Sequence, residues 1–146
     1  MNSLVYLDNC CFNRPYDNQL HPLVKIETQA KLVIQQKIIE GEIDLVWSFI
    51  LYFENSKNPF AERKNQILLW KDIAKYSVSL QEDTRSKAAG IMKLGINLKD
   101  ALHIACAIQA GADCFITTDK KLLNKTMKEL SILNPVDFLR RHYDGD

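Results

Sequence analysis

Four carboxylates in this sequence stand where the chain is predicted to leave a strand or to enter a helix. Asp8 and Asp119 each directly follow a short apolar run, Glu54 lies in a predicted helix after a third run, and Asp100 lies in the first turn of another predicted helix. In a parallel sheet, strand ends and the helix starts that follow them gather at the carboxyl edge, where ligands bind. Connectivity places three of the acids at this edge, and Asp100 joins them if its helix enters from the same side.

Carboxylates held this close together can do metal-dependent chemistry. Two like charges about 4 Å apart repel each other by about 4 kcal/mol at an effective dielectric constant of about 20. A divalent cation relieves that repulsion, and ligation by oxygen alone suits Mg²⁺ or Mn²⁺. Such an ion activates water and stabilises the charge of a phosphodiester transition state. Together, the four acids favour a functional site.

Each acid also has a structural explanation when it is taken singly. Asp100 follows Asn97 by three residues, as in a helix cap, and Asp119 could cap the next predicted helix. Asp8 could bond loop amides, as aspartates do in turns. Glu54 is harder to explain in this way, because it closes the apolar run "VWSFILYFE" and there needs a partner or a shifted pKa.

The cysteines indicate neither zinc nor a disulfide framework. They are Cys10, Cys11, Cys106 and Cys114. None forms a C-x-x-C pair, and the three histidines have no zinc-ligand spacing relative to them. The vicinal pair could form a strained disulfide, which a reducing compartment disfavours. We expect small, buried, apolar side chains.

Composition predicts one soluble globular domain over residues 1–146. Hydrophobic residues make up 47% and charged residues 25% of the chain. The formal net charge of +1 argues weakly against wholesale electrostatic capture of nucleic acid, although a local basic face remains open. The start of the chain lacks the pattern of a signal peptide, and the longest apolar run is interrupted by Ser48. We therefore expect a cytoplasmic protein without a membrane span.

The alternation of short β-rich runs with longer helical ones predicts an α/β fold with a mainly parallel sheet. Strands are expected over 4–7, 43–47, 77–80, 114–118 and 131–134. Helices are expected over 23–41, 49–57, 59–76, 81–96, 97–112, 119–130 and 136–143. Between the first strand and the first of these helices we expect a loop containing Pro15 and Pro22.

Three stretches of the chain resemble the PIN-domain ribonucleases, the fold of the VapC-type toxins. "VYLDNCC" is similar to the opening strand with the first catalytic aspartate, and "VWSFILYFEN" to the strand–helix unit with the glutamate of that family. "LKDALHIACAIQAGADCFITTD" is the most specific stretch, similar to the helix with the third acid and the strand end with the fourth. The resemblance runs across nearly the whole length.

The resemblance implies a three-layer fold, with a central sheet of four to five mainly parallel strands flanked by helices. It implies metal-dependent endonuclease activity on RNA that leaves a 5′-phosphate, and an antitoxin as a protein partner. The ligands of one or two Mg²⁺ or Mn²⁺ ions, direct or through water, would be Asp8, Glu54, Asp100 and Asp119, the last of these least directly. Asn9 and Thr118 would orient these carboxylates.

Two further features have more than one interpretation. The segment "DNCCFNRPYDNQ" is longer than in typical toxins, and Asn13, Arg14 and Asp17 mark it as distinctive. Arg14 could hold a phosphate through two hydrogen bonds or pair with Asp17, and we favour the structural role. His103 shares a helix face with Asp100, and we expect it to bond a neighbour rather than act as a general base.

A non-catalytic PIN-fold module for RNA binding or assembly is the alternative function. The clustered acids argue against it, because carboxylates near RNA give a pure binding protein nothing. A response-regulator receiver ranks last, since the chain lacks two adjacent acids after the first strand. The apolar residues Leu68, Leu69, Trp70 and Ile73 exceed what a small sheet should need, which predicts a homodimer.

Overall fold

A five-stranded parallel sheet forms the centre of the computed structural model, which describes residues 2–145. The strands are β1 (Ser3–Leu7), β2 (Ile43–Ser48), β3 (Tyr76–Val78), β4 (Cys114–Ile116) and β5 (Ser131–Leu133). They lie in the order β3-β2-β1-β4-β5, and all four pairings are parallel. The strands predicted over 77–80 and 131–134 correspond to β3 and β5, which form the two edges of the sheet.

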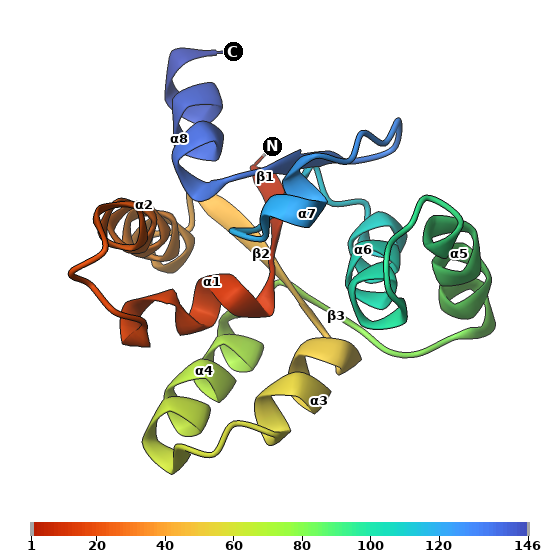
Figure 1. Ribbon diagram of the computed structural model, residues 1–146, viewed down its shortest axis with the longest axis horizontal. Helices are drawn as coiled ribbons and strands as arrows, with labels where there is room; N and C mark the ends of the chain where they lie inside the picture. Colours follow the sequence, from red (N-terminus) through yellow and green to blue (C-terminus); the bar gives the residue numbers. More distant parts are fainter. Residues whose placement is uncertain (1, 146) are drawn as a thin grey trace.

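Helices cover both faces of the sheet, which makes three layers. They are α1 (Asn9–Asn13), the 3₁₀ turn η1 (Arg14–Tyr16), α2 (Pro22–Ile39), α3 (Phe49–Ser56), α4 (Ala61–Ile73), α5 (Glu82–Met92), α6 (Leu98–Ala110), α7 (Lys120–Leu123) and α8 (Pro135–Asp144). Figure 1 shows α2 and α8 on one side of the sheet and α6, backed by α5, on the other. The predicted fold class is confirmed.

None of the helices within residues 2–145 has the length and apolar character needed to cross a membrane.

The strand order creates a switch point beside the central strand. The chain runs outward from β1 through β2 to β3, and then returns to pair β4 with the opposite side of β1. Connections therefore leave the carboxyl ends of β1 and β4 in opposite directions, which opens a crevice at that edge of a parallel sheet. Asp8 comes directly after β1, so the fold places it at the switch point.

Two segments differ from their predicted structure. The expected loop after β1 contains α1 and η1, because the Asp8 side chain accepts a hydrogen bond from the Asn9 amide and Pro15 suits the start of a helical turn. The helix expected over 119–130 is only the short α7. The chain that follows it is irregular, and Lys125 Nζ donates to the backbone oxygen of Leu94 at 3.0 Å.

A buried lysine lies at the groove between α2 and α4. Lys31 is only 3% exposed, and its Nζ donates to Gln35 Oε1 at 2.7 Å. Within residues 2–145 no carboxylate pairs with it, and burial lowers the pKa of Lys31 to about 8. Both side chains line a cavity of about 240 Å³ together with Trp70. An ammonium without a counter-charge is costly at such a position.

We predict that Lys31→Met stabilises the protein at neutral pH. The charged amine costs roughly 3 kcal/mol of folding free energy, because its pKa is lower in the folded than in the unfolded chain. That cost is complete below about pH 8 and disappears as pH rises toward the pKa of the unfolded chain. Melting temperatures of both proteins between pH 7 and 10 should converge, and a constant difference would contradict the assignment.

Candidate active site

Asp8 is held in place by β1 and by the end of β4. Its backbone amide donates to the carbonyl of Ile116 at 2.9 Å, which extends the β1–β4 pairing by one residue. Its Oδ1 accepts the Asn9 amide at 2.8 Å, and its Oδ2 accepts the Thr117 hydroxyl at 2.8 Å. Asp8 is only 6% exposed, and burial, with contributions from Cys10 and Asp100, raises its pKa well above the usual range.

Thr117 connects two of the acids, although the orienting role was predicted for its neighbour Thr118. Its hydroxyl donates to Asp8 and accepts the backbone amide of Asp119 at 3.1 Å. The predicted orienting residue Thr118 instead donates its amide to the Cys10 sulfur at 3.4 Å. In this structure, therefore, Thr117 is the residue that orients the Asp8 carboxylate, and a buried Thr directly after a strand was the signal for it.

Asn9 lies beside Asp8 with an unused acceptor. The backbone amide of Asn9 donates to the Asp8 carboxylate. The side-chain Oδ1 of Asn9 is buried and has no hydrogen-bond partner in the described part of the chain. A buried carbonyl oxygen without a donor is unusual in a folded protein. Next to a buried carboxylate, such an oxygen is suited to a cation or to one of its water ligands.

Glu54 reaches the same site from α3. Its side chain is 14% exposed, and its two oxygens contact His103 Nε2 and, at 3.3 Å, Lys99 Nζ. Burial alone would raise its pKa, but the hydrogen bond and electrostatic interaction with His103, together with Lys99, lower the pKa below the usual value. Glu54 is therefore ionised at neutral pH. Donor atoms of Asp8, Glu54 and His103 lie within 4.8 Å of one another.

Asp100 enters the site because α6 begins at the carboxyl edge. Burial and the charge of Asp119 raise its pKa, and Glu54 also contributes. The backbone amide of Asp100 donates a hydrogen bond to Asn97 Oδ1 at 2.9 Å. Asp119 Oδ1 accepts a hydrogen bond from the backbone amide of Lys121 at 2.9 Å. The capping roles considered from the sequence are thus present. They coexist with an electrostatic cluster that connects all four predicted acids.

The donor set fits a hard divalent cation. Asp8 and Glu54 offer carboxylate oxygens within 4.8 Å of each other and of a His103 nitrogen, and the unpartnered Asn9 oxygen lies next to Asp8. Asp100 interacts electrostatically with Asp8, Glu54 and Asp119. Mg²⁺ and Mn²⁺ prefer such oxygen ligands. The raised pKa values of Asp8 and Asp100 indicate that their negative charge lacks compensation by the protein itself.

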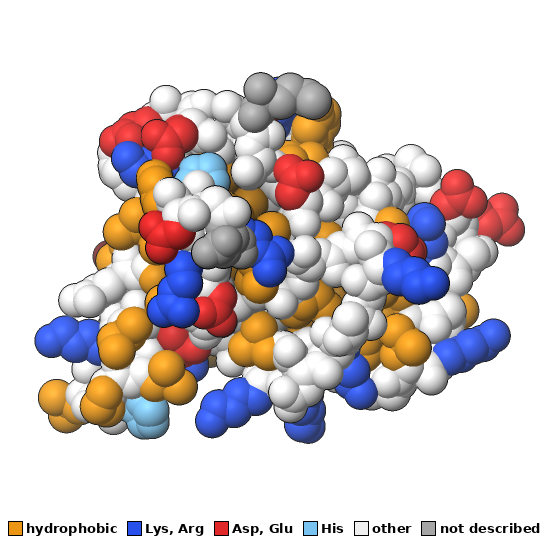
Figure 2. All heavy atoms as spheres, turned by 90° about the horizontal axis from the view of Figure 1, so that it is seen from above, with side chains coloured by type: hydrophobic (Ala, Val, Ile, Leu, Met, Phe, Trp, Pro, Cys, Tyr) orange, Lys and Arg blue, Asp and Glu red, His pale blue; other side chains and the backbone are white. Residues whose placement is uncertain are grey.

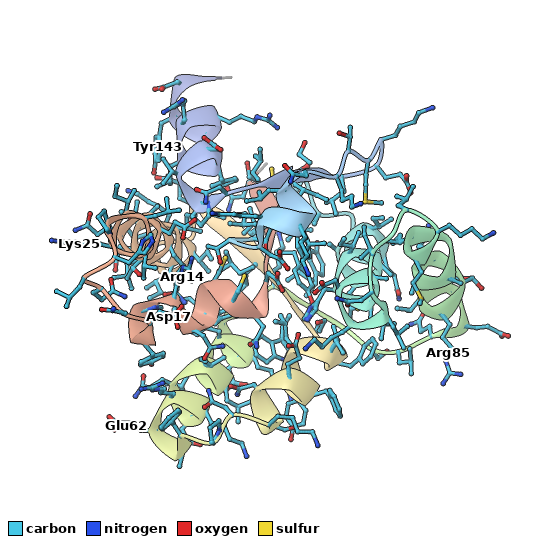
Figure 3. The ribbon with its side chains drawn as sticks, viewed as in Figure 1. Arg14, Asp17, Lys25, Glu62, Arg85 and Tyr143 are labelled. Carbon is cyan, nitrogen blue, oxygen red and sulfur yellow. The ribbon has the colours of Figure 1, made fainter. Side chains whose placement is uncertain are left out.

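Arg14 lies outside this cluster. Figure 3 shows it beside Asp17, between α1 and α2, and its Nη1 contacts Asp17 Oδ2 at 3.0 Å. The stronger pair is with Glu27 of α2, which accepts Nε at 3.0 Å and Nη2 at 2.7 Å and is only 2% exposed. Glu27 also accepts the Asn134 side chain at 2.6 Å. Sequence reasoning missed Glu27, which lies thirteen positions away on another helix.

The cysteines are free thiols. Cys106 and Cys114 are buried, as is Cys11, whose sulfur donates to the Ile116 carbonyl at 3.3 Å. Cys10 is only partly buried and touches the site, with its sulfur 3.5 Å from Asp8 Oδ2. A side-chain hydrogen bond with the Cys11 thiol is the main reason why the pKa of Cys10 falls to about 6.

The fold and its acidic edge define a class: three-layer parallel α/β domains with a carboxylate-lined site at the switch point. The family model described as "PIN domain" matches residues 22–128, which is more than half of the chain. The chain therefore belongs to the PIN domain family. Asp8 precedes the matched residues, so its place in the site rests on the strand pairing of β1.

A solved structure shares the fold. The chain is similar to one in the crystal structure of VapBC2 from Rickettsia felis bound to a DNA fragment from their promoter. The TM-score is 0.55 at 14% sequence identity, with 90% of this chain and 98% of that chain covered. No curated protein matches the sequence.

We predict that Asp8→Asn raises the melting temperature of the metal-free protein at neutral pH. Because the pKa of Asp8 is raised on folding, ionising it costs stability once pH exceeds the ordinary range of a carboxyl group. Asparagine keeps an oxygen for the Asn9 amide. The difference should vanish near pH 3, where Asp8 is protonated in both states. A variant that melts lower at pH 7 in EDTA would instead make Asp8 a purely structural residue.

Proposed function

We propose that this protein is a metal-dependent endoribonuclease that hydrolyses phosphodiester bonds of RNA in the cytoplasm. The observation that carries the proposal is the gathering of Asp8, Glu54, Asp100 and Asp119 at the switch-point edge of the sheet, with Asp8 buried and poorly compensated. Membership of the PIN domain family supports it. A protein that only binds RNA would lose affinity from these charges and gain nothing from them.

The residues have distinct roles in this proposal. Asp8 and Asp100 would hold Mg²⁺ or Mn²⁺, with Glu54 and Asp119 as ligands directly or through water. When bound, such an ion supplies a Lewis acid and lowers the pKa of a water molecule. Thr117 keeps the Asp8 carboxylate in its orientation, and Lys99, beside Glu54, places a positive charge at the rim of the site for the phosphate.

A protein partner is the second part of the proposal. The Rickettsia felis structure is of a VapBC2 complex, which supports a toxin with an antitoxin as the biological setting. Hydrophobic side chains gather on the surface over α2, at the left of Figure 2. Those of α2 include Leu23, Ile26, Leu32, Val33 and Ile39, all more than 40% exposed. Surfaces of this kind mark protein contacts.

The proposed activity is tested by cleavage of a labelled RNA with Mn²⁺. Asp8→Asn should reduce the rate at least about a hundredfold, because an amide oxygen is a poor substitute for an anionic ligand. Glu42→Gln, at an exposed glutamate directly before β2, is the matched control and should cleave as the wild type does. An Asp8→Asn protein that still cleaves at the wild-type rate would remove the catalytic role.

We also predict a homodimer in the absence of an antitoxin. Of the four apolar residues that suggested it, Leu69 and Ile73 are exposed on α4 at 54% and 42%, while Leu68 and Trp70 pack partly against the core. Light scattering at micromolar concentration should give twice the monomer mass, and Leu69→Lys should reduce it by placing a charge in the contact. A monomeric wild type would contradict the prediction.

A further inference from the structure

A chain of buried hydrogen bonds connects the sheet to one of the site carboxylates. Ser48 Oγ at the end of β2 lies 2.6 Å from Tyr6 Oη on β1, and Tyr6 Oη lies 2.6 Å from His103 Nδ1 on α6. The other ring nitrogen of His103, Nε2, bonds Glu54 on α3. Ser48, Tyr6 and His103 are each 0% exposed. Four elements thus meet through three consecutive contacts, and of these only β2 and α3 are adjacent in sequence.

The direction of these bonds follows from the chemistry of their ends. An ionised carboxylate only accepts, so His103 Nε2 must donate to Glu54. If the imidazole is neutral, Nδ1 accepts from the Tyr6 hydroxyl, and if it is protonated, Nδ1 donates to the Tyr6 oxygen. In both cases the phenol keeps its proton, because burial raises its pKa. The Tyr6 hydroxyl accepts from Ser48 in the first case and donates to it in the second, and Ser48 Oγ also accepts a hydrogen bond from the Leu51 amide at 3.2 Å. Every group in the chain is satisfied.

Aromatic packing holds Tyr6 between His103 and Phe115. Tyr6 stacks on Phe115 with ring centroids 5.2 Å apart, and its edge meets His103 at 5.7 Å. The tyrosine is therefore fixed by an aromatic neighbour of β4 as well as by its hydroxyl. Because both nitrogens of His103 are engaged, the imidazole could bind a cation or accept a proton from water only by breaking a bond that the fold supplies.

We propose that Tyr6 and His103 are positioning residues that orient the Glu54 carboxylate toward the cation of the site. This inference rests on the proposed function, because it assigns a role in the same metal site. Without the relay, Glu54 would keep only the contact from Lys99, whose side chain is 56% exposed. Partners that orient a metal ligand in this way typically contribute ten- to a hundredfold to metal affinity.

The decisive variant is Tyr6→Phe, which removes the hydroxyl and keeps the stacked ring. We expect Mn²⁺ affinity, measured by electron paramagnetic resonance or calorimetry without RNA, to fall at least about tenfold. In a Glu54→Gln background the same change should have no further effect, since Tyr6 acts through Glu54. This non-additivity separates positioning from a general loss of stability, which would lower affinity equally in both backgrounds.

Thr84→Val is the matched control for losing a buried hydroxyl. Thr84 is 0% exposed and donates to Gln109 at the opposite end of α6 from Asp100. It should lower the melting temperature and leave Mn²⁺ affinity unchanged. If the wild type binds Mn²⁺ and Tyr6→Phe binds it equally well, the relay is wrong and the metal site stands. If the wild type binds no Mn²⁺, the metal site is wrong, and with it the role given to Tyr6 and His103.

Discussion

The hydrogen bond between the Thr117 hydroxyl and the Asp8 carboxylate joins the carboxyl ends of the two central strands. It matters because the acids around it repel one another, and the fold must keep them together without neutralising them. The same hydroxyl also accepts a hydrogen bond from the backbone amide of Asp119, so one buried side chain fixes both the carboxylate after β1 and the turn after β4. The parallel register of β1 and β4 makes this contact available.

The negative charges of Glu54 and Asp8 are stabilised to different degrees by the side chains around them. Glu54 is stabilised as an anion by His103 and Lys99, whereas Asp8 has mainly neutral donors and keeps a raised pKa. Arg14 and Glu27 form a separate, partly buried pair that anchors the segment after Asp8 to α2. The segment that leaves the site is thus held by contacts outside the acidic cluster. An arrangement with unrelieved charge at one edge is typical of a site whose function costs stability.

Much of this architecture could be predicted because it depends on local patterns. Apolar runs bounded by turn residues gave the five strands, and their alternation with helices gave the parallel sheet. The short α1 was missed because its five residues offer no periodicity. The predicted helix at α7 was too long because Met127 and Leu130 continue an apolar spacing, although they pack on the core from irregular chain.

The contacts within the site were harder to anticipate for a different reason. Tyr6 lies inside a buried strand, where its aromatic ring alone explains its presence, and nothing in the sequence indicates that its hydroxyl meets a histidine 97 residues later. Glu27 likewise resembles a solvent-facing helix position until Arg14 and Asn134 are placed beside it. Such pairs depend on the packing of whole elements, so sequence spacing identifies the candidate residues but leaves their partners open.

Charge in this protein is balanced over short distances rather than over the whole surface. The face seen from above mixes basic, acidic and apolar side chains, in keeping with a formal net charge of +1 (Figure 2). Near the site, Lys99 directly precedes Asp100, and Lys120 and Lys121 directly follow Asp119, all three exposed. Under the proposed function, a phosphodiester approaches four carboxylates only when a cation and these lysines offset their field. Under that proposal, net charge says little about a polynucleotide substrate, because the attraction would arise at the site and would depend on a cation held there.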